Sequence, residues 1–424
     1  MFHPFSGSPR KAFITFSLSL CVLGLSLSAA PALAEQARPG EAVFKLLESG
    51  NQAELQKRLK LGDINAFYLV PDSGLARTPL MWAAEAGKPE LVKWLLAHKA
   101  DPKLKEPEFG NDALLLAISA GQLASARALV ANGASLATHN QDGETPLMAA
   151  AAQSDPELVQ WLLDQKQDLS AHDKLDNDAL MYAVWNGQLA CARLLVSKGA
   201  DPRELTHENV NLLMVAADRG SVEIATWLVE EVGLEVGALD VNQASALLHA
   251  VWSGQVAVAE YLATQGANTH ETWDGSDLLM YLAPAGHVPM AGWLIDSQQI
   301  SVHTRDASGS NALFLAAGAG QLGLVEYLVE RGASPHRRDG EGRTLLMKAV
   351  YGKQPELVSW LLESLRLNPN ARDTCSRSVL DHAHSAGNPE IIGLLQAAGA
   401  APGNDTCPAE PDPETEPETE PASD

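Results

Sequence analysis

Cysteine is scarce in this chain of 424 residues, which has only four, and aromatic residues make up 5% of it. So few cysteines cannot form the dense disulfide framework on which small secreted domains depend. Basic residues are also in short supply, with 30 Lys and Arg against 53 Asp and Glu and a formal net charge of −23. An acidic surface repels phosphate backbones and anionic lipid heads, which argues against nucleic-acid binding. It favours another protein with a basic or apolar surface as the partner.

Signatures of catalysis are missing as well. The sequence has no Gly-rich phosphate loop, and no His lies beside a Ser or Cys in an arrangement typical of a nucleophile. The Asp-His-Ala-His string from Asp381 to His384 contains two His, but residues two apart on a helix do not face one another. We therefore expect no enzyme, no catalytic residues, no metal site and no cofactor.

Long apolar runs are confined to the N-terminus. Arg10 and Lys11 precede an apolar run over residues 12–27, and small residues follow it up to Ala34. A basic start, an apolar middle and an A-x-A exit are typical of a cleavable export signal, and the run is too short to span a bilayer comfortably. We therefore expect residues 1–34 to be a signal peptide cleaved near Ala34, with an uncleaved anchor as the alternative. The mature protein is then periplasmic or secreted, with no integral membrane span.

The C-terminus has a composition of its own. Residues 401–424 contain eight acidic residues and no basic one, and Pro alternates with acids after Pro408. A segment with nothing to bury and one sign of charge should be disordered and extended by self-repulsion. It serves either as a solubilising tail or as a docking peptide.

One short motif recurs through the rest of the chain. The segment 78–83 (Thr-Pro-Leu-Met-Trp-Ala) aligns with later segments so that its Leu returns every 32–34 residues. The landmark residues are Leu80, Leu114, Leu147, Leu180, Leu213, Leu247, Leu279, Leu313, Leu346 and Leu380. A fixed period of this length indicates helical repeats, each of which buries its apolar face only by stacking on its neighbours.

Helix signals return in the same register. The residue two before each landmark Leu has a side chain that can accept a hydrogen bond from the N-terminus of a helix. These residues are Thr78, Asp112, Thr145, Asp178, Asn211, Ser245, Asp277, Asn311, Thr344 and Ser378. A second helix begins at Pro89, Pro156, Pro355 and Pro389, where Pro suits the first helical position and the following Glu suits the helix dipole.

This pattern resembles the ankyrin repeat over residues 41–400. The resemblance implies an all-α solenoid of about ten to eleven helix-turn-helix repeats with finger loops, in a repeat domain of residues 35–400. Residues 41–62 then form an atypical N-terminal cap, and residues 401–407 resemble the finger of an unfinished repeat ahead of the tail.

The same resemblance implies a function. Ankyrin proteins bind other proteins, so we expect a monomeric, non-catalytic scaffold. Two roles fit an exported member of the family. One is an accessory factor for a periplasmic enzyme or stress defence, and the other is an immunity protein that occludes a delivered toxin.

Aromatic residues fall into two groups. Seven share one position of the second helix, which we expect to face the core: Trp94, Trp161, Trp227, Tyr261, Trp293, Tyr327 and Trp360. Others stand before the Gly that ends the first helix, a position that lines the concave groove in ankyrin proteins. There we expect partner contacts from Trp185, Trp252 and Tyr351, together with Glu85 and Asp218, because exposed Trp and Tyr are enriched among binding hot spots. Partial burial on neighbouring helices is the alternative.

The first finger is longer than the others and carries the apolar run Phe67, Tyr68 and Leu69. This run either folds back over the N-terminal cap or forms a tip that contacts the partner.

Sulfur-containing residues also follow the repeat. Six Met stand directly after a landmark Leu, where the family usually has His, and we expect them to fill gaps in the core rather than to bind metal. Cys191 occupies an apolar position and should be a buried free thiol. Cys375 and Cys407 end matching Asp-Thr-Cys tripeptides one repeat apart. We expect them to form a disulfide, which an oxidising compartment permits.

Overall fold

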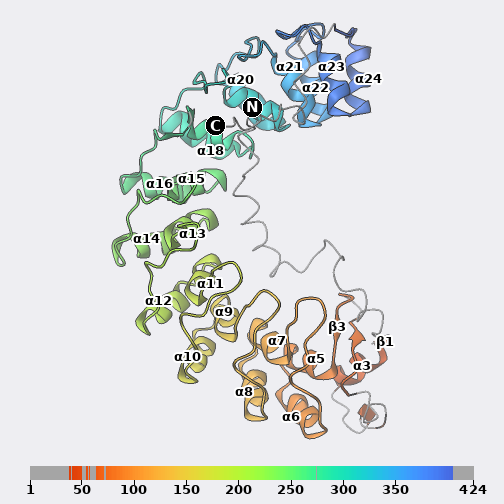
Figure 1. Ribbon diagram of the computed structural model, residues 1–424, viewed down its shortest axis with the longest axis vertical. Coiled ribbons are helices and arrows are strands. Elements are labelled where there is room, and N and C mark those ends of the chain that lie inside the picture. Colours follow the sequence, from red (N-terminus) through yellow and green to blue (C-terminus); the bar gives the residue numbers. More distant parts are fainter. Residues whose placement is uncertain are drawn as a thin grey trace, which may run out of the picture. The chain divides into compact units, whose positions relative to one another are not determined.

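The computed structural model describes residues 38–39, 41–49, 54–55, 57, 64–70, 73–273 and 275–403. Two compact units, Met1–Ala246 (unit 1) and Leu247–Asp424 (unit 2), divide the chain and are considered separately. The expected signal peptide, the acidic tail and Cys407 lie outside the described residues. The all-α repeat fold that the sequence predicts is confirmed, since helix pairs follow one another through both units (Figure 1).

The described part of unit 1 includes α3 (Glu41–Ser49) near its N-terminal end, followed by five helix pairs. The pairs are α5 (Pro79–Glu85) with α6 (Pro89–Ala97), α7 (Ala113–Ser119) with α8 (Leu123–Ala131), α9 (Pro146–Ala151) with α10 (Pro156–Asp164), α11 (Ala179–Trp185) with α12 (Leu189–Ser197), and α13 (Leu212–Arg219) with α14 (Val222–Glu230). The first helices α5, α7, α9, α11 and α13 pack against one another in sequence and form one layer.

Unit 2 repeats the arrangement with more irregular helices. Its pairs are α15 (Ala246–Trp252) with α16 (Val256–Thr264), α17 (Leu278–Leu282) with α18 (Val288–Gly292), α19 (Ala312–Gly318) with α20 (Leu322–Glu330), α21 (Leu345–Ala349) with α22 (Pro355–Glu363), and α23 (Val379–Ala386) with α24 (Pro389–Ala397). A π-helical turn, Trp293–Ser297, extends α18, and a 3₁₀ turn, Val350–Gly352, extends α21.

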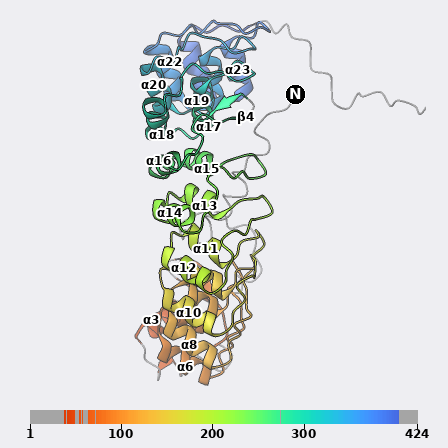
Figure 2. The same ribbon diagram turned by 90° about the vertical axis from the view of Figure 1, so that its left-hand side faces the viewer.

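The landmark Leu residues form the spine of both units, because all ten are at most 4% exposed. The loop that joins each second helix to the next first helix is called a finger below. Figure 2 shows the second helices on one side of each unit and the fingers on the other. The fingers are therefore surfaces that the packing of the repeat core does not bury.

Helix caps form where the sequence predicts them. In nine of the ten predicted positions, the side chain accepts a hydrogen bond from a main-chain N–H in the first turn. In three repeats the Met after the landmark Leu completes the cap. The Sδ of Met81 accepts the N–H of Thr78 at 3.5 Å, and Met148 accepts that of Thr145 at 3.4 Å. These sulfurs lie in a reciprocal cap, in addition to filling core space as expected.

A small sheet closes the N-terminal end of unit 1. Strand β2 (Tyr68–Leu69) pairs in parallel with β1 (Arg38–Pro39) and antiparallel with β3 (Ala76–Arg77). Tyr68 is 5% exposed, and its ring packs edge-on against Phe44 of α3, with the ring centroids 6.5 Å apart. The long first finger thus folds back onto the cap helix. Tyr68 is therefore removed from the set of expected partner contacts, while Phe67 and Leu69 are half-buried beside it.

Candidate protein-binding surfaces

Three fingers of unit 1 are tight turns, each held by one polar side chain. Asp173 Oδ1 accepts the main-chain N–H groups of Leu175 at 2.8 Å and of Asn177 at 2.9 Å. Asn140 and Asp240 hold their own fingers through the same pair of bonds, to the second and fourth residues that follow. A side chain that binds two N–H groups fixes the turn from within.

Main-chain hydrogen bonds also join one finger to the next. The N–H of Gln141 donates to the carbonyl oxygen of Phe109 at 2.8 Å, and that of Lys174 donates to Asp142 at 2.8 Å. Further along, the N–H of Val241 donates to Glu208 at 2.9 Å. These bonds hold neighbouring fingers at a fixed distance, so their tips form a preorganised surface. Preorganised loops lose less conformational entropy when a partner binds.

Large apolar side chains gather on three successive fingers of unit 1. Leu175 is 46% exposed, Leu205 and Val241 are each 50% exposed, and Leu239 is 44% exposed. We call these four residues the apolar finger row. Single exposed apolar residues are common, but a series of them marks a binding surface more often than chance. The sequence analysis missed this row, although Leu205 and Leu239 occupy the same position in consecutive repeats and could have drawn notice.

Carboxylates surround the row. Asp201, Glu204, Glu208 and Glu235 are exposed on the same three fingers, together with Asp168 and Glu231. The exposed bases there are fewer: Lys166, Lys174, Lys198 and Arg203. The surface is thus apolar at its centre and acidic around it. Such a surface complements a partner that has apolar side chains flanked by Lys or Arg.

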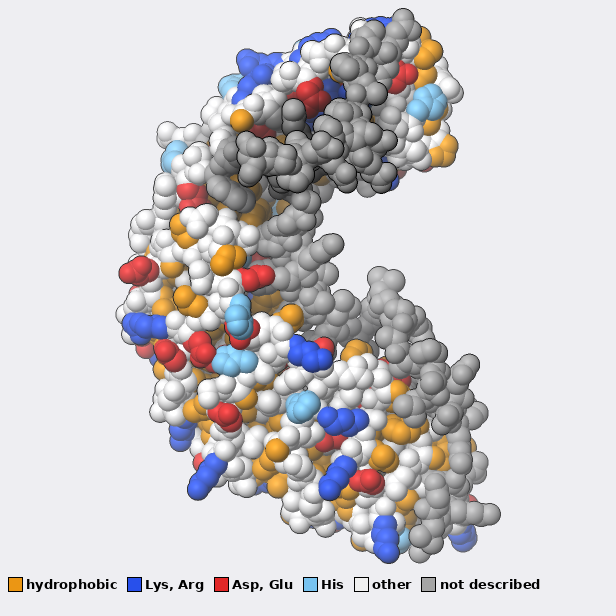
Figure 3. All heavy atoms as spheres, viewed as in Figure 1, with side chains coloured by type: hydrophobic (Ala, Val, Ile, Leu, Met, Phe, Trp, Pro, Cys, Tyr) orange, Lys and Arg blue, Asp and Glu red, His pale blue; other side chains and the backbone are white. Residues whose placement is uncertain are grey.

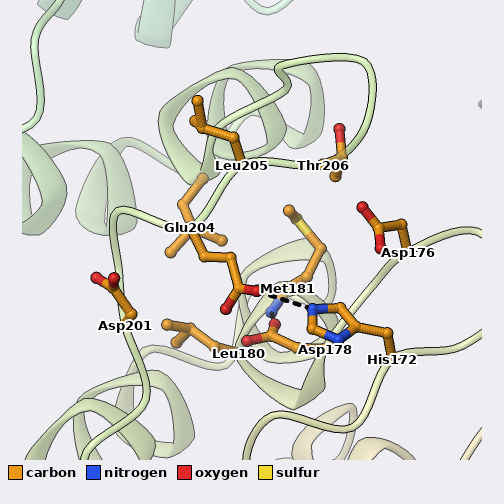
Figure 4. A pocket seen from close by; sticks show the side chains of 10 residues that line it. His172, Asp176, Asp178, Leu180, Met181, Asp201, Glu204, Leu205 and Thr206 are labelled. Carbon is orange, nitrogen blue, oxygen red and sulfur yellow. Dashed lines mark hydrogen bonds and ion pairs between the residues drawn. The ribbon is translucent and has the colours of Figure 1, made fainter.

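A pocket lies between the fingers that carry Leu175 and Leu205 (Figure 4). His172 points across it to Glu204, with Nε2 3.0 Å from the carboxylate Oε1. On the same two fingers, Asp176 Oδ2 lies 2.7 Å from the ring Nδ1 of His207 and accepts its main-chain N–H at 2.9 Å. Two histidine–carboxylate pairs therefore link these fingers.

Asp178 forms the floor of the pocket and has an unusual protonation equilibrium. Its carboxylate accepts the N–H of Met181 at 2.7 Å and so caps α11. Burial raises the pKa of Asp178 to about 6, against the effect of that hydrogen bond. Among the described residues no group of His, Cys, Asp and Glu is arranged to hold a metal ion.

Trp185 corrects the prediction of an exposed groove. It is only 7% exposed because the guanidinium of Arg219, on the next first helix, covers its ring. The Nε of Arg219 also donates to the carbonyl oxygen of Trp185 at 3.0 Å. Trp185 is therefore part of the packing between α11 and α13 and does not stand in the groove.

Trp252 and Tyr351 lie in unit 2 and differ from each other. Trp252 is half-buried, with its ring edge-on to those of His249 and Tyr281 at centroid distances of 5.9 and 6.0 Å. Tyr351 is 43% exposed, as predicted, while its hydroxyl lies 2.9 Å from Nδ1 of the buried His382. His382 Nε2 lies 2.9 Å from Asp373 Oδ2, so this His is held within the repeat.

The two predicted groove acids also differ in their surroundings. Glu85 is exposed and forms an ion pair with the buried Arg77, whose Nε lies 3.3 Å from Oε2. Asp218 is half-buried. The contribution of Glu85, Asp218, Trp252 and Tyr351 to partner binding stays a prediction.

The aromatic position of the second helices is less buried than predicted. Trp227 and Trp293 are buried, at 5% and 6% exposed, but the other five residues are half-buried. Cations stack on several of them, with Arg127 over Trp161 and Arg331 over Tyr327 at 6.0 and 4.8 Å from the ring centroids. The position therefore lies at the border of the core, where a ring contacts apolar neighbours on one side and a guanidinium on the other.

The cysteine predictions can be checked only in part. Cys191 is 1% exposed and free, as predicted, and its Sγ lies 3.3 Å from the carbonyl oxygen of Gln153. Burial raises the pKa of this thiol to about 11, which keeps it unreactive. The pairing of Cys375 with Cys407 stays a prediction, because Cys407 lies outside the described residues.

Sequence comparison agrees with this architecture. The family model described as ankyrin repeats (3 copies) matches residues 33–140, 134–206 and 198–272, and a second model, ankyrin repeats (many copies), matches residues 313–362. The chain belongs to the ankyrin-repeat family. Ankyrin repeats are in general protein-binding scaffolds without catalytic activity.

Individual relatives match this chain over part of their own length. The Caenorhabditis elegans ankyrin repeat and KH domain-containing protein mask-1 is 29% identical over 297 residues, which cover 68% of this chain and 11% of the relative. The human transient receptor potential cation channel subfamily A member 1 is 25% identical over 72% of this chain and 28% of the channel. An L-asparaginase from Dirofilaria immitis is 26% identical over 43% of this chain and 30% of the enzyme. The chain spans less than a third of each of these proteins. No helix among the described residues is long and apolar enough to cross a membrane.

Proposed function

We propose that this ankyrin chain is a non-catalytic scaffold that captures a protein partner on the fingers of unit 1. The apolar finger row carries the proposal. Leu175, Leu205, Leu239 and Val241 are each at least 44% exposed on fingers that hydrogen bonds hold in place. Fully burying a Leu or Val side chain contributes about 1.5–3 kcal/mol, and these four side chains, at 44–50% exposed, leave about half of that area for a partner to bury.

The partner's chemistry follows from the acids around the row. Asp201, Glu204, Glu208 and Glu235 favour a partner with Lys or Arg beside its apolar contacts. Charges at the rim of an interface act mainly on the association rate, which then falls as salt screens them. We therefore expect association with the partner to slow as the salt concentration rises.

An exported role is the setting that the N-terminal sequence favours. In that setting the scaffold is an accessory factor for a periplasmic enzyme or stress defence, and an immunity protein that occludes a toxin is the second candidate. An accessory factor alters the activity or stability of its client. An immunity protein forms a one-to-one complex that dissociates very slowly.

The test compares a triple variant of the row with a single variant of similar exposure outside it. Wild-type chain, L175S/L205S/L239S and F109S, at a residue that is 43% exposed, are used to capture proteins from a periplasmic extract, and the captured proteins are quantified by mass spectrometry. A partner of the apolar finger row falls at least tenfold with the triple variant and is retained with F109S. The partner is then purified, and its affinity and dissociation rate are measured with the same variants. Equal capture by all three proteins would show that the row is not the binding surface.

A further inference from the structure

Three successive fingers of unit 2 carry an arginine in the same place. Arg305, Arg338 and Arg372 each directly precede the acid that holds their finger, and all three are exposed. We call them the arginine row. Figure 3 shows Lys and Arg side chains gathered over this edge of unit 2. The corresponding residues on the last two fingers of unit 1, Leu205 and Leu239, are apolar, so the chemistry at this repeat position changes along the chain.

Each arginine reaches the main chain of the following finger. Arg305 Nη1 donates to the carbonyl oxygen of Arg338 at 3.4 Å, and Arg338 Nη1 donates to that of Arg372 at 2.5 Å. Arg372 Nη2 then donates to Pro402 at 3.3 Å. A guanidinium has five N–H donors, so these contacts leave most donors of each arginine for another acceptor.

The described residues of unit 2 do not neutralise the charge of the row. Among the described residues, no carboxylate lies within ion-pair distance of Arg305, Arg338 or Arg372. Arg343 and Arg377, from the same fingers, do pair with Asp339 and Asp373, at 2.8 and 3.1 Å. The row is therefore a line of exposed positive charge in a chain whose net charge is strongly negative.

The described chain ends against the same fingers. The N–H of Ala401 donates to Asn370 Oδ1 at 2.8 Å, and the N–H of Gly403 donates to Asp381 Oδ2 at 2.8 Å. A Cβ at Gly403 would lie 2.5 Å from the carbonyl oxygen of Ser376, so only glycine permits this approach. The residues that follow Gly403 consequently start at the last arginine of the row.

We propose that the acidic C-terminal segment, residues 404–424, binds the arginine row of its own chain. From Glu410 to Glu420 every second residue of the segment is acidic, and no base interrupts it. Its 21 residues can extend over roughly 70 Å, whereas three repeats at about 10 Å each span far less. A short tether also gives the segment an effective concentration of about millimolar near the row. Guanidinium and carboxylate groups can form bidentate contacts, so the arginine row and the acidic segment are chemically complementary.

Binding of the segment covers the fingers of unit 2. An acidic protein that approaches the row then has to displace it. The inference does not depend on the apolar finger row, which lies in unit 1, so each can fail without the other.

The experiment uses the full chain and a chain that ends at Pro408, which keeps Cys407 and loses seven acids. The probe is a fluorescein-labelled synthetic peptide of residues 408–424, titrated with each protein and followed by fluorescence anisotropy. We expect the shortened chain to bind the peptide, with an affinity that falls as salt is added. The full chain should bind it at least tenfold more weakly, because its own segment occupies the row.

Two triple variants of the shortened chain locate the site. R305Q/R338Q/R372Q should lose at least tenfold in affinity. The control R127Q/R193Q/R203Q removes three exposed arginines of unit 1. Arg203 donates to a main-chain carbonyl, as the arginines of the row do, while Arg127 and Arg193 form ion pairs with Glu157 and Glu231. This control should bind within twofold of the unmodified protein. If R305Q/R338Q/R372Q does not fold, the unmodified shortened chain is titrated with a peptide that has Gln in place of each Glu, and this peptide should not bind.

Equal binding to the full and shortened chains overturns the proposal and assigns the row to an external acidic partner. Binding that survives in R305Q/R338Q/R372Q, or no binding to the shortened chain, also overturns it.

Discussion

The guanidinium of Arg219 lies over the indole of Trp185, with Cζ 4.9 Å from the ring centroid, and the two residues come from neighbouring first helices. This contact buries a side chain at a groove position where the repeat pattern alone predicts exposure. Removing the indole would leave a cavity between α11 and α13, and Trp→Ala changes in cores cost about 3–5 kcal/mol.

Trp185→Ala is therefore expected to lower the free energy of unfolding by about 3 kcal/mol while partner affinity stays nearly constant. Urea unfolding followed by circular dichroism measures the first effect, and titration of the captured partner measures the second. Leu175→Ala is the control: it should change stability by less than about 0.5 kcal/mol, as is usual for surface positions. A stable W185A that has lost its partner would restore Trp185 to the binding surface.

Repeat period, caps and core Leu positions could be predicted because they are set by local rules that act identically in every repeat. Thr145 caps α9 and Leu147 is buried, as the corresponding residues are in the other repeats. The groove could not be predicted in the same way. Whether Trp185 is exposed depends on Arg219, 34 residues later, and whether Tyr351 is exposed depends on the side chains around His382. The exposure of a surface side chain depends on its contacts with neighbouring repeats. The pattern of a single repeat carries no information about those contacts.

Glu106 is expected to make stability depend on pH near neutrality. Its carboxyl is 1% exposed, and burial, followed by a hydrogen bond with Glu108, raises its pKa from 4.5 to about 7, although Arg77 opposes the shift. Above about pH 4.5 the unfolded chain releases a proton that the folded chain keeps until about pH 7. The free energy of unfolding therefore falls as pH rises through this window, by up to about 3 kcal/mol for a shift of this size.

Glu106→Gln removes the titrating group and keeps one oxygen, which can still accept the N–H groups of Phe109 and Asn111 that Oε1 now accepts. The N–H of Glu108, which donates to Oε2, loses its acceptor in this variant. Urea unfolding between pH 5 and pH 8 should show a smaller loss of stability for E106Q than for the wild type. Glu90→Gln, at an exposed position of α6, is the control and should leave the slope unchanged. Parallel pH profiles for E106Q and wild type would assign the slope to another group.

Tyr68 is expected to stabilise the N-terminal end of unit 1. Its ring fills the space between β2 and Phe44, so Tyr68→Ala should cost about 3–4 kcal/mol, in the range of large aromatic truncations. Because the loss is local, hydrogen exchange should accelerate in α3 and β2 while α11 to α14 remain protected. Partner affinity should be unchanged. Weaker partner binding by Y68A with unaltered exchange would instead support the first finger as a contact.

The last prediction is the disulfide between Cys375 and Cys407. Cys375 lies in the turn that Asp373 holds, where its N–H donates to Asp373 Oδ1 at 2.9 Å. Residues 401–403 run along that same finger, so they bring the chain toward it four residues before Cys407. This approach answers the main geometric objection: matching positions of complete repeats stand about 10 Å apart, while a disulfide needs Cα atoms within about 7 Å.

A crosslink that closes this loop should stabilise the chain by roughly 3.5–4 kcal/mol on the loop-entropy model, less any strain. Its effect should be confined to the C-terminal end of unit 2, because each repeat in such a protein contacts only its immediate neighbours. Cys407→Ser should therefore increase hydrogen exchange in α23 and α24 and leave unit 1 unaffected. Non-reducing peptide mapping of protein from an oxidising compartment should find the two cysteines in one crosslinked peptide pair. Quantitative alkylation of both thiols in that sample, without prior reduction, would contradict the bond.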